Sequence, residues 1–137
     1  MKQLCIVFVF ATLTGCVTPP DVSRVMSVDE VATAPEEYQG QRVIVRGFLS
    51  FGDDRKNLWS SRDTYEKVAR EGKDSGDPIS NQCLSVLTTE NSEYYALRGN
   101  DKTEVSLSGI VTIIDLTDRI NLGFCSNIAL SEPEIRR

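Results

Sequence analysis

The sequence has few residues whose types and spacing are suited to catalysis. It contains no histidine, which is the commonest acid–base residue and metal ligand in enzymes. A nucleophilic serine or cysteine needs a neighbouring base, and the sequence has neither a Gly-x-Ser-x-Gly nor a Ser-x-x-Lys motif. Glycine-rich loops that bind phosphate groups are also missing from it. We therefore expect a protein that is not an enzyme and that uses no cofactor.

Acidic residues occur in pairs at three places, and paired carboxylates are the groups that act as acid and base in some enzymes or bind calcium. The pairs are Glu36 with Glu37, Asp53 with Asp54, and Asp115 with Asp118. Adjacent residues of a strand point to opposite faces of the sheet, and carboxylates in turns are usually solvated. No twelve-residue calcium-binding loop surrounds any pair. The pairs therefore predict neither a catalytic centre nor a metal site.

Four residues combine aromatic and basic chemistry, namely Trp59, Tyr65, Arg42 and Arg46. On one face of a sheet, such residues can bind a glycan, a small molecule or a nucleic acid. The net charge of −5 argues against nucleic acid, because counterion release requires a basic stripe on the protein. Trp59 has a second interpretation, which the sequence favours: it packs beneath the loop or helix that follows it.

The N-terminus has the features of a secretory signal. After Lys2 comes an apolar run over residues 4–13, shorter than the roughly 20 residues that a membrane-spanning helix needs. The run ends in Leu-Thr-Gly-Cys at residues 13–16, which resembles the lipobox of bacterial lipoproteins. The resemblance implies removal of residues 1–15 and attachment of lipid to Cys16, with membrane anchoring by several acyl chains. The alternatives are an ordinary secreted protein that is cut nearby and a chance cysteine in an anchor helix.

The resemblance also bears on the membrane that receives the protein. In lipoproteins of bacteria with two membranes, Asp after the lipidated cysteine usually means retention at the inner membrane. Val17 therefore implies the outer membrane, with the domain at its periplasmic face. The mature chain carries 14 Lys and Arg against 20 Asp and Glu, a net charge of −6. Residues 16–26 are expected to be a lipidated tether, because residues 17–21 are polar and rich in proline.

Two stretches, residues 43–51 and 105–111, alternate apolar and polar side chains with the period of a half-buried strand. Gly47 and Gly109 fall on the apolar face of each, where a glycine indicates a bend or a close approach of backbone. The other expected elements are strands over residues 58–60, 83–88 and 120–130, helices over 62–71 and 91–98, a helix capped by Ser27 and Glu30, and a loop over 73–82.

Five strands, with the two longest bent at glycine, predict a mainly β fold with short helices, an OB-like five-stranded partly open barrel. The Pro-Glu-Glu-Tyr-x-Gly-x-Arg-Val-x-Val-x-Gly-Phe-Leu pattern of residues 35–49 resembles the opening of small bacterial OB-like domains of uncharacterised function. This likeness covers residues 25–130 and implies no catalytic residue. We expect the OB-like domain to span residues 27–131, followed by a charged tail over residues 132–137.

Two cysteines, Cys83 and Cys125, remain once the signal has been removed and Cys16 carries lipid. In an oxidising compartment, two remaining thiols favour one disulfide. The OB order of strands puts the third and fifth strands side by side, so both thiols would project on the non-core side. A bridge there would close a loop of some 40 residues and contribute roughly 3–4 kcal/mol. Two free thiols are the alternative.

These features together predict a non-catalytic, lipid-anchored periplasmic protein whose OB-like domain binds a protein partner in the cell envelope. The alternative is a ligand-binding module for a glycan or a small molecule, with its site on the face near Trp59 and Tyr65. An exposed aromatic groove would favour the ligand, and an exposed apolar patch would favour the protein partner.

Overall fold

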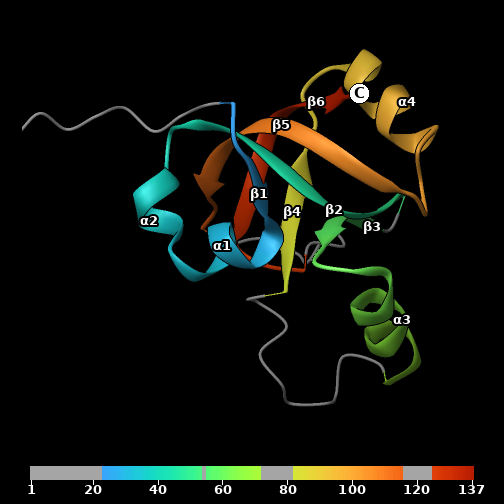
Figure 1. The fold of residues 1–137 in the computed structure, drawn as a ribbon. Coiled ribbons are helices and arrows are strands. Elements are labelled where there is room, and N and C mark those ends of the chain that lie inside the picture. Colours follow the sequence, from blue (N-terminus) through green and yellow to red (C-terminus); the bar gives the residue numbers. More distant parts are fainter. Residues whose placement is uncertain (1–22, 54, 72–81, 116–124) are drawn as a thin grey trace, which may run out of the picture.

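The computed structural model describes residues 23–53, 55–71, 82–115 and 125–137. Within them the fold is mainly β, as predicted, and short helices surround the strands (Figure 1). The elements in chain order are β1 (Val25–Ser27), α1 (Val28–Thr33), α2 (Pro35–Tyr38), β2 (Arg42–Gly52), β3 (Arg55–Trp59), α3 (Arg62–Glu71), β4 (Cys83–Leu87), α4 (Asn91–Arg98), β5 (Glu104–Ile113) and β6 (Ile128–Arg136). The expected signal, Cys16 and most of the expected loop over residues 73–82 lie outside the described residues.

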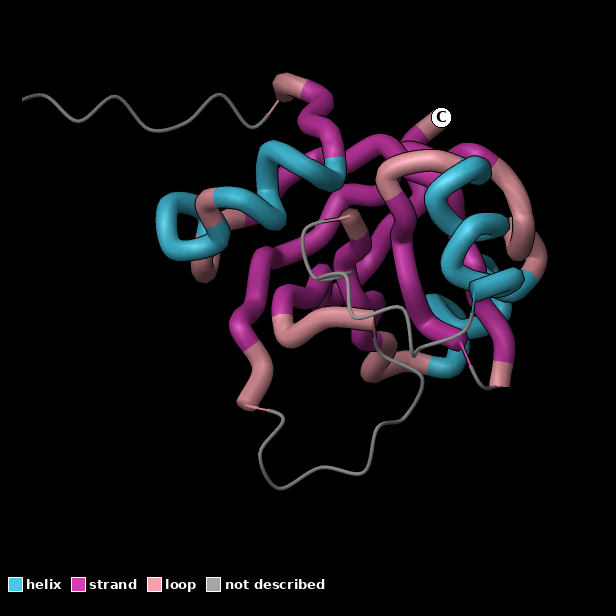
Figure 2. Tube along the Cα trace, turned by 90° about the horizontal axis from the view of Figure 1, so that it is seen from below, coloured by secondary structure: helices cyan, strands magenta, loops and turns pink. Residues whose placement is uncertain are grey.

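Five of the strands pair in a closed ring. Antiparallel pairs join β2 to β3, β3 to β4, β5 to β6 and β5 back to β2, and one parallel pair joins β4 to β6. β1 adds to β2 as a parallel sixth strand, so the sheet has six strands where the sequence predicted five. Figure 2 shows the strands grouped around a common centre with the helices outside them. Side chains from all five ring strands fill that centre, including Val45, Leu58, Leu84, Leu107 and Leu130.

β2 is the strand with the most neighbours in the sheet, because it pairs with β1, β3 and β5. Its first half pairs with β1, where Arg46 faces Ser27, and its second half pairs with β3, where Phe48 faces Trp59. Gly47 stands between the two halves. A Cβ at Gly47 would lie 2.5 Å from the carbonyl oxygen of Trp59, so only glycine lets β3 approach this closely. The predicted need for glycine in this strand therefore has a specific cause, the close approach of a neighbouring backbone.

The second predicted glycine lies at an irregularity in the sheet. Between β5 and β6 the register shifts from Ser108 to Ile110, and Gly109 lies in the gap. A Cβ at Gly109 would come within 3.1 Å of both Leu130 Cβ and the carbonyl oxygen of Ser131. The extra residue on β6 is accommodated as in a β-bulge, which bends a strand and increases its twist.

The predicted helices are confirmed in place and extent. Ser27 caps α1 through a capping box with Glu30, whose backbone N–H donates to the Ser27 hydroxyl at 3.2 Å. α1 ends at Thr33, and its Val28 and Val31 are fully buried against the strands. α3 and α4 have the bounds predicted from the sequence. Short local signals therefore predict where these helices begin and end, and the burial of their apolar residues stabilises them.

The chain ends differ from the predictions. The expected charged tail over residues 132–137 belongs largely to β6, which runs to Arg136 and pairs with β5, while residues 120–124 of the predicted strand lie outside the described residues. Ile135 pairs with Leu107 and packs against the core, which explains why the strand continues past the acidic residues. Similarly, the end of the expected tether over residues 16–26 includes β1, because Met26 is buried in the core.

Candidate functional site

The outer face of β2, β3 and β4 holds a second, smaller cluster of buried side chains, separate from the centre of the ring. The cluster consists of Phe48, Trp59 and Cys83, with Tyr65, Val68 and Cys125 packed against them. Tyr65 and Val68 come from α3, which lies over the end of this face (Figure 1). Trp59 is only 5% exposed, and its ring lies 5.9 Å from that of Tyr65. Packing beneath the following helix, the interpretation favoured by the sequence, is therefore confirmed for Trp59.

The predicted disulfide between Cys83 and Cys125 is present in this cluster. The two Cα atoms are 6.2 Å apart, within the range that disulfides span. Cys83 begins β4, whereas Cys125 lies three residues before β6 and not within a strand. The backbone N–H of Cys125 donates to Asn57 Oδ1 at 3.0 Å, which ties this segment to β3. The bridge therefore ties β4 to the segment that leads into β6, the strand that pairs with β4. The cysteines pair as predicted, but only Cys83 lies within a strand.

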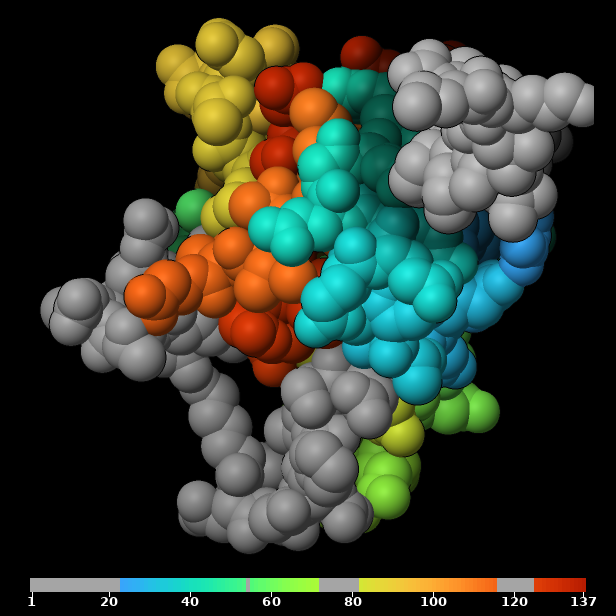
Figure 3. Space-filling view, turned by 90° about the vertical axis from the view of Figure 1, so that its left-hand side faces the viewer, coloured from blue at the N-terminus to red at the C-terminus, as the bar shows by residue number. Residues whose placement is uncertain are grey.

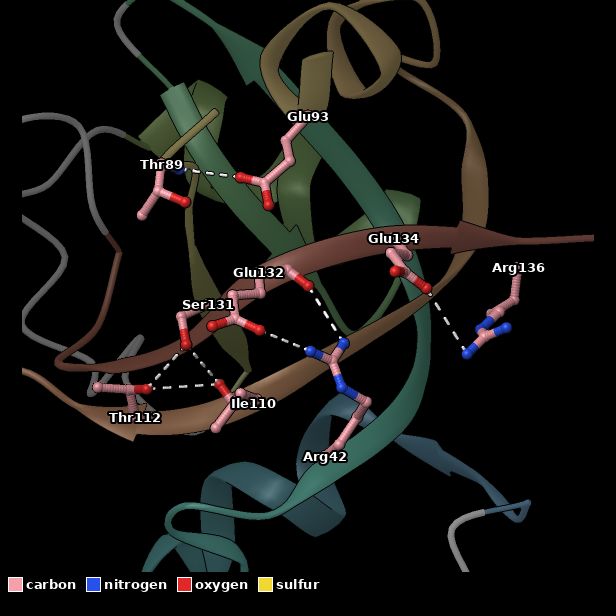
Figure 4. Close-up of polar contacts among 9 residues, drawn as sticks. All are labelled: Arg42, Thr89, Glu93, Ile110, Thr112, Ser131, Glu132, Glu134 and Arg136. Carbon is pink, nitrogen blue, oxygen red and sulfur yellow. Dashed lines mark hydrogen bonds and ion pairs between the residues drawn. The ribbon is translucent and has the colours of Figure 1, made fainter. Parts of the chain in front are cut away.

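The two arginines assigned to the same face lie elsewhere. Arg42 binds Glu132, with its Nη2 2.8 Å from Oε2, and its Nη1 donates to the Glu132 carbonyl at 3.3 Å (Figure 4). Arg42 is six residues from Phe48, the pairing partner of Trp59, and this corresponds to about 20 Å along the strand. Arg46 is exposed, with its Nε 3.8 Å from a carboxylate oxygen of Glu104. Only Trp59 and Tyr65 of the four predicted site residues are in contact.

The structure instead brings basic and polar groups from other elements to the hydroxyl of Tyr65. Lys102 Nζ donates to this hydroxyl and lies 3.5 Å from Ser50 Oγ. Arg55 Nη1 donates to the same hydroxyl at 3.2 Å. Burial raises the pKa of the Tyr65 phenol, but the hydrogen bond and charge of Lys102, with the charge of Arg55, outweigh burial and lower it. Tyr65 therefore lies in a locally positive environment.

Backbone contacts fix the position of Lys102. Its N–H donates to the Leu49 carbonyl at 2.9 Å, and the Leu49 N–H donates to the Thr103 carbonyl at 2.9 Å. Lys102 itself adopts a φ of 63°, which turns the chain from α4 into β5. No sequence pattern indicated the contact between Lys102 and Tyr65, because the two residues are 37 positions apart and no motif connects them.

A polar network links the β2–β3 hairpin to α4. Asp53 Oδ1 accepts from the Tyr94 hydroxyl at 2.7 Å and from Arg98 Nη1 at 2.8 Å. The Tyr94 hydrogen bond and the charge of Arg98 lower the pKa of Asp53. Next to this network Tyr95 is 70% exposed, with its ring 5.6 Å from that of Tyr94. The network is structural, and it leaves one aromatic ring of α4 open to solvent.

A groove of about 760 Å³ runs between α4 and the end of β6. Figure 3 shows these two elements side by side at the surface. Ala96, Leu97 and Ile135 give the groove an apolar part, while Glu93, Glu134 and Arg136 are among its charged residues. Glu134 and Arg136 also pair with each other at 3.6 Å (Figure 4). A surface with an apolar part and charges of both signs suits a polypeptide better than a polyanion.

Other possible sites have little support in the described part of the chain. No three His, Cys, Asp or Glu residues there come together in a group that might hold a metal ion. No helix among the described residues is long and apolar enough to cross a membrane. Comparisons with protein-family models, curated proteins and solved structures found no match to this chain.

Proposed function

We propose that this chain is a lipid-anchored protein of the bacterial cell envelope whose OB-like domain binds a partner protein. The strand order supports the OB-like assignment. With β2 as the first ring strand, the order around the ring is first, second, third, fifth, fourth and back to the first. The third and fifth ring strands are parallel, and α4 lies between the third and fourth in the chain. An OB-like five-stranded Greek-key barrel would have this strand order, which supports the assignment that we propose.

The disulfide supports a location outside the cytosol. Disulfides form and persist in oxidising compartments such as the periplasm, and reducing systems remove them in the cytosol. The bridge between Cys83 and Cys125 therefore agrees with the secretory signal at the N-terminus. Lipidation at Cys16 would then hold the domain at the membrane surface, and Val17 favours the outer membrane.

The burial of Trp59 beneath α3 is the observation that carries the choice of a protein partner. A glycan or a nucleic acid that stacked on the predicted face near Trp59 would need that ring exposed, and Trp59 is 5% exposed. The groove between α4 and β6 is open, and Tyr95 stands exposed on the same helix. Tyrosine is enriched among the residues that contribute most to protein–protein binding. We place the partner at this groove.

Site-specific photo-crosslinking in intact cells tests the proposal. A photoreactive amino acid replaces Ala96, which is exposed in the groove, and a matched control replaces Glu36, which is exposed on α2. We expect one envelope protein to be crosslinked at position 96 and not at position 36. A glycan adduct at position 96 would favour the ligand-binding alternative. Identical products at both positions, or none at position 96, would overturn the proposal.

A further inference from the structure

The last part of β6 has an unpaired edge. β4 pairs with β6 only as far as Leu87, opposite Ser131, and the chain then turns into α4. β6 continues to Arg136 and pairs there with β5 alone. Among the described residues, no strand pairs with this part of β6 on its other side. The groove between α4 and β6 lies along that side, next to the C-terminal end of the strand (Figure 1).

The hydrogen bonds of β5 show which backbone groups of β6 face this edge. The Val111 N–H donates at 3.0 Å to the carbonyl of Gln41, next to β2, so the odd-numbered residues of β5 face β2. The even-numbered residues therefore face β6, where Ser108 pairs with Glu134. Because the backbone groups of a strand alternate between its two edges, the N–H and C=O of Ile135 point away from β5, toward the groove.

The position of Pro133 agrees with this geometry. Pro133 lies two residues before Ile135 and faces the same open edge, where its missing N–H removes no hydrogen bond from the sheet. The proline and the bend at Glu132 restrict the open edge to a short stretch, which limits edge-to-edge aggregation. α4 has eight residues and is therefore about 12 Å long. Alongside it, the groove accommodates about four residues of extended chain, at about 3.4 Å each.

We infer that this groove binds an extended segment of the partner protein, which adds to β6 as a further strand. The inference rests on the proposed function and specifies the form in which the partner binds. In strand addition, main-chain hydrogen bonds give affinity and the contacts of alternate side chains give specificity. The side chain opposite Ile135 lies on the same face of the sheet, where Ala96 and Leu97 line the groove. We therefore expect an apolar residue at that position of the segment.

The exposed side chains of β6 define the charges of this segment. Glu134 and Arg136 project on the face opposite to that of Ile135, with more than half of each side chain exposed (Figure 4). Opposite charges on directly facing residues of neighbouring strands stabilise the pair. The segment should therefore carry a basic residue opposite Glu134 and an acidic residue opposite Arg136, with the apolar residue between them. A second copy paired through β6 would bring Pro133 into the new ladder without an N–H to donate, so we choose a partner protein as the occupant.

A peptide titration of the lipidated chain in neutral detergent tests the inference. The chain carries isotope-labelled isoleucine, and the readout is hydrogen exchange of the Ile135 amide by NMR. The probe is a capped Lys-Val-Glu-Val-Lys peptide, whose symmetric order presents the same charges in either strand direction. We expect exchange of the Ile135 amide to slow by about tenfold at saturation, because a bonded amide exchanges only when its bond opens. The Ile44 amide, in the part of β2 that is paired on both sides, is the internal control.

Substitutions probe the apolar and the charged contacts separately. Ala96→Gln puts a longer polar side chain into the apolar part of the groove, and we expect it to weaken binding severalfold. Ala69→Gln is the matched control, because Ala69 is also an exposed helical alanine and lies on α3, outside the groove. Glu134→Lys makes the edge of β6 basic. This variant should bind a Glu-Val-Glu-Val-Glu peptide more tightly than the mixed probe, the reverse of the order expected for the native chain.

Several outcomes would overturn the added strand. Unchanged exchange of the Ile135 amide at the highest peptide concentration, or equal protection by a probe with every backbone amide N-methylated, would exclude pairing with β6. Equal weakening by the two glutamine variants would exclude the groove. Protection that rises with protein concentration in the absence of peptide would identify a second copy as the occupant. The crosslink at Ala96 tests the partner separately. A crosslink without protection of Ile135 by the peptide overturns the added strand alone, and protection without a crosslink overturns the proposed function.

Discussion

Gly47→Ala is the substitution for which the structure gives the clearest expectation. The added Cβ would lie 2.5 Å from the Trp59 carbonyl oxygen and 3.0 Å from side-chain carbons of both Leu58 and Val28. The closest of these atoms belongs to the backbone of β3, which cannot move away by a change of rotamer. Either β2 or β3 must shift, and the pairing of Phe48 with Trp59 weakens in consequence.

The expected cost follows from the crowding. Extra carbon atoms in a packed interior usually destabilise by about 1–3 kcal/mol, and occasionally by more. Because a strand has to move at Gly47, we expect Gly47→Ala to lower the free energy of unfolding by about 3 kcal/mol. For a domain of this size, each kcal/mol corresponds to a change of about 4–8 °C in Tm, so Tm should fall by about 12–24 °C.

Two other glycines provide graded controls for this experiment. At Gly109 the nearest atoms to an added Cβ lie at 3.1 Å, so Gly109→Ala should cost about 1–2 kcal/mol. At Gly99 they lie at 3.5 Å, which is ordinary contact, and Gly99→Ala should change stability by less than about 0.5 kcal/mol. Denaturant unfolding of all three variants measures the order. If Gly47→Ala proved as stable as Gly99→Ala, the close approach of β3 to β2 would be refuted.

Three further predictions concern the cysteines and Tyr65. The native chain should show no reactive thiol at Cys83 or Cys125 until reductant is added. Reduction should lower the free energy of unfolding by about 4 kcal/mol, because the disulfide restricts the unfolded chain by closing a loop with a sequence separation of 42 residues. Cys16→Ser should abolish labelling by a palmitate analogue and release the protein from membranes, whereas unchanged labelling would contradict lipidation. Tyr65 should ionise at lower pH than an ordinary tyrosine, and Lys102→Met should raise its pKa in an ultraviolet titration. The pKa of Tyr65 is lower in the folded chain than in the unfolded chain. Ionisation of Tyr65 therefore stabilises the fold at pH values above the ordinary tyrosine pKa, and this stabilisation is lost as the pH falls through the folded pKa.

Local patterns were enough to predict most of the fold. The alternation over residues 43–51 identified β2, and in the structure Val43 and Val45 of this strand face the core as the pattern predicted. The same pattern missed that Phe48 and Ser50 are also buried, because burial on the second face depends on α3 and on the turn before β5. A sequence pattern reports one buried face, and the second face becomes buried only through contacts between distant residues.

The misplaced end of the last strand has a related cause. Glu132 and Pro133 interrupt the alternation, and proline usually ends a strand or lies at its edge. In the structure Glu132 has a φ of 49° and sits at the bulge opposite Gly109, so the strand resumes beyond it. Arg42 holds this bend by binding both the side chain and the carbonyl of Glu132. No pattern in residues 128–137 indicates this contact, because its partner is 90 residues away.

α3 explains why Trp59 and Tyr65 lie together in the structure without forming an exposed aromatic face. Its bounds and its apolar residues Tyr65 and Val68 were readable at helical spacing, yet spacing alone does not say which face the helix covers. By packing on the outer face of β2 and β3, the helix buries Trp59 and removes it from any ligand. The same packing carries the hydroxyl of Tyr65 to the edge of the cluster, where Lys102 reaches it. One helix thus closes the aromatic face that the sequence suggested and creates the polar site that the sequence did not indicate.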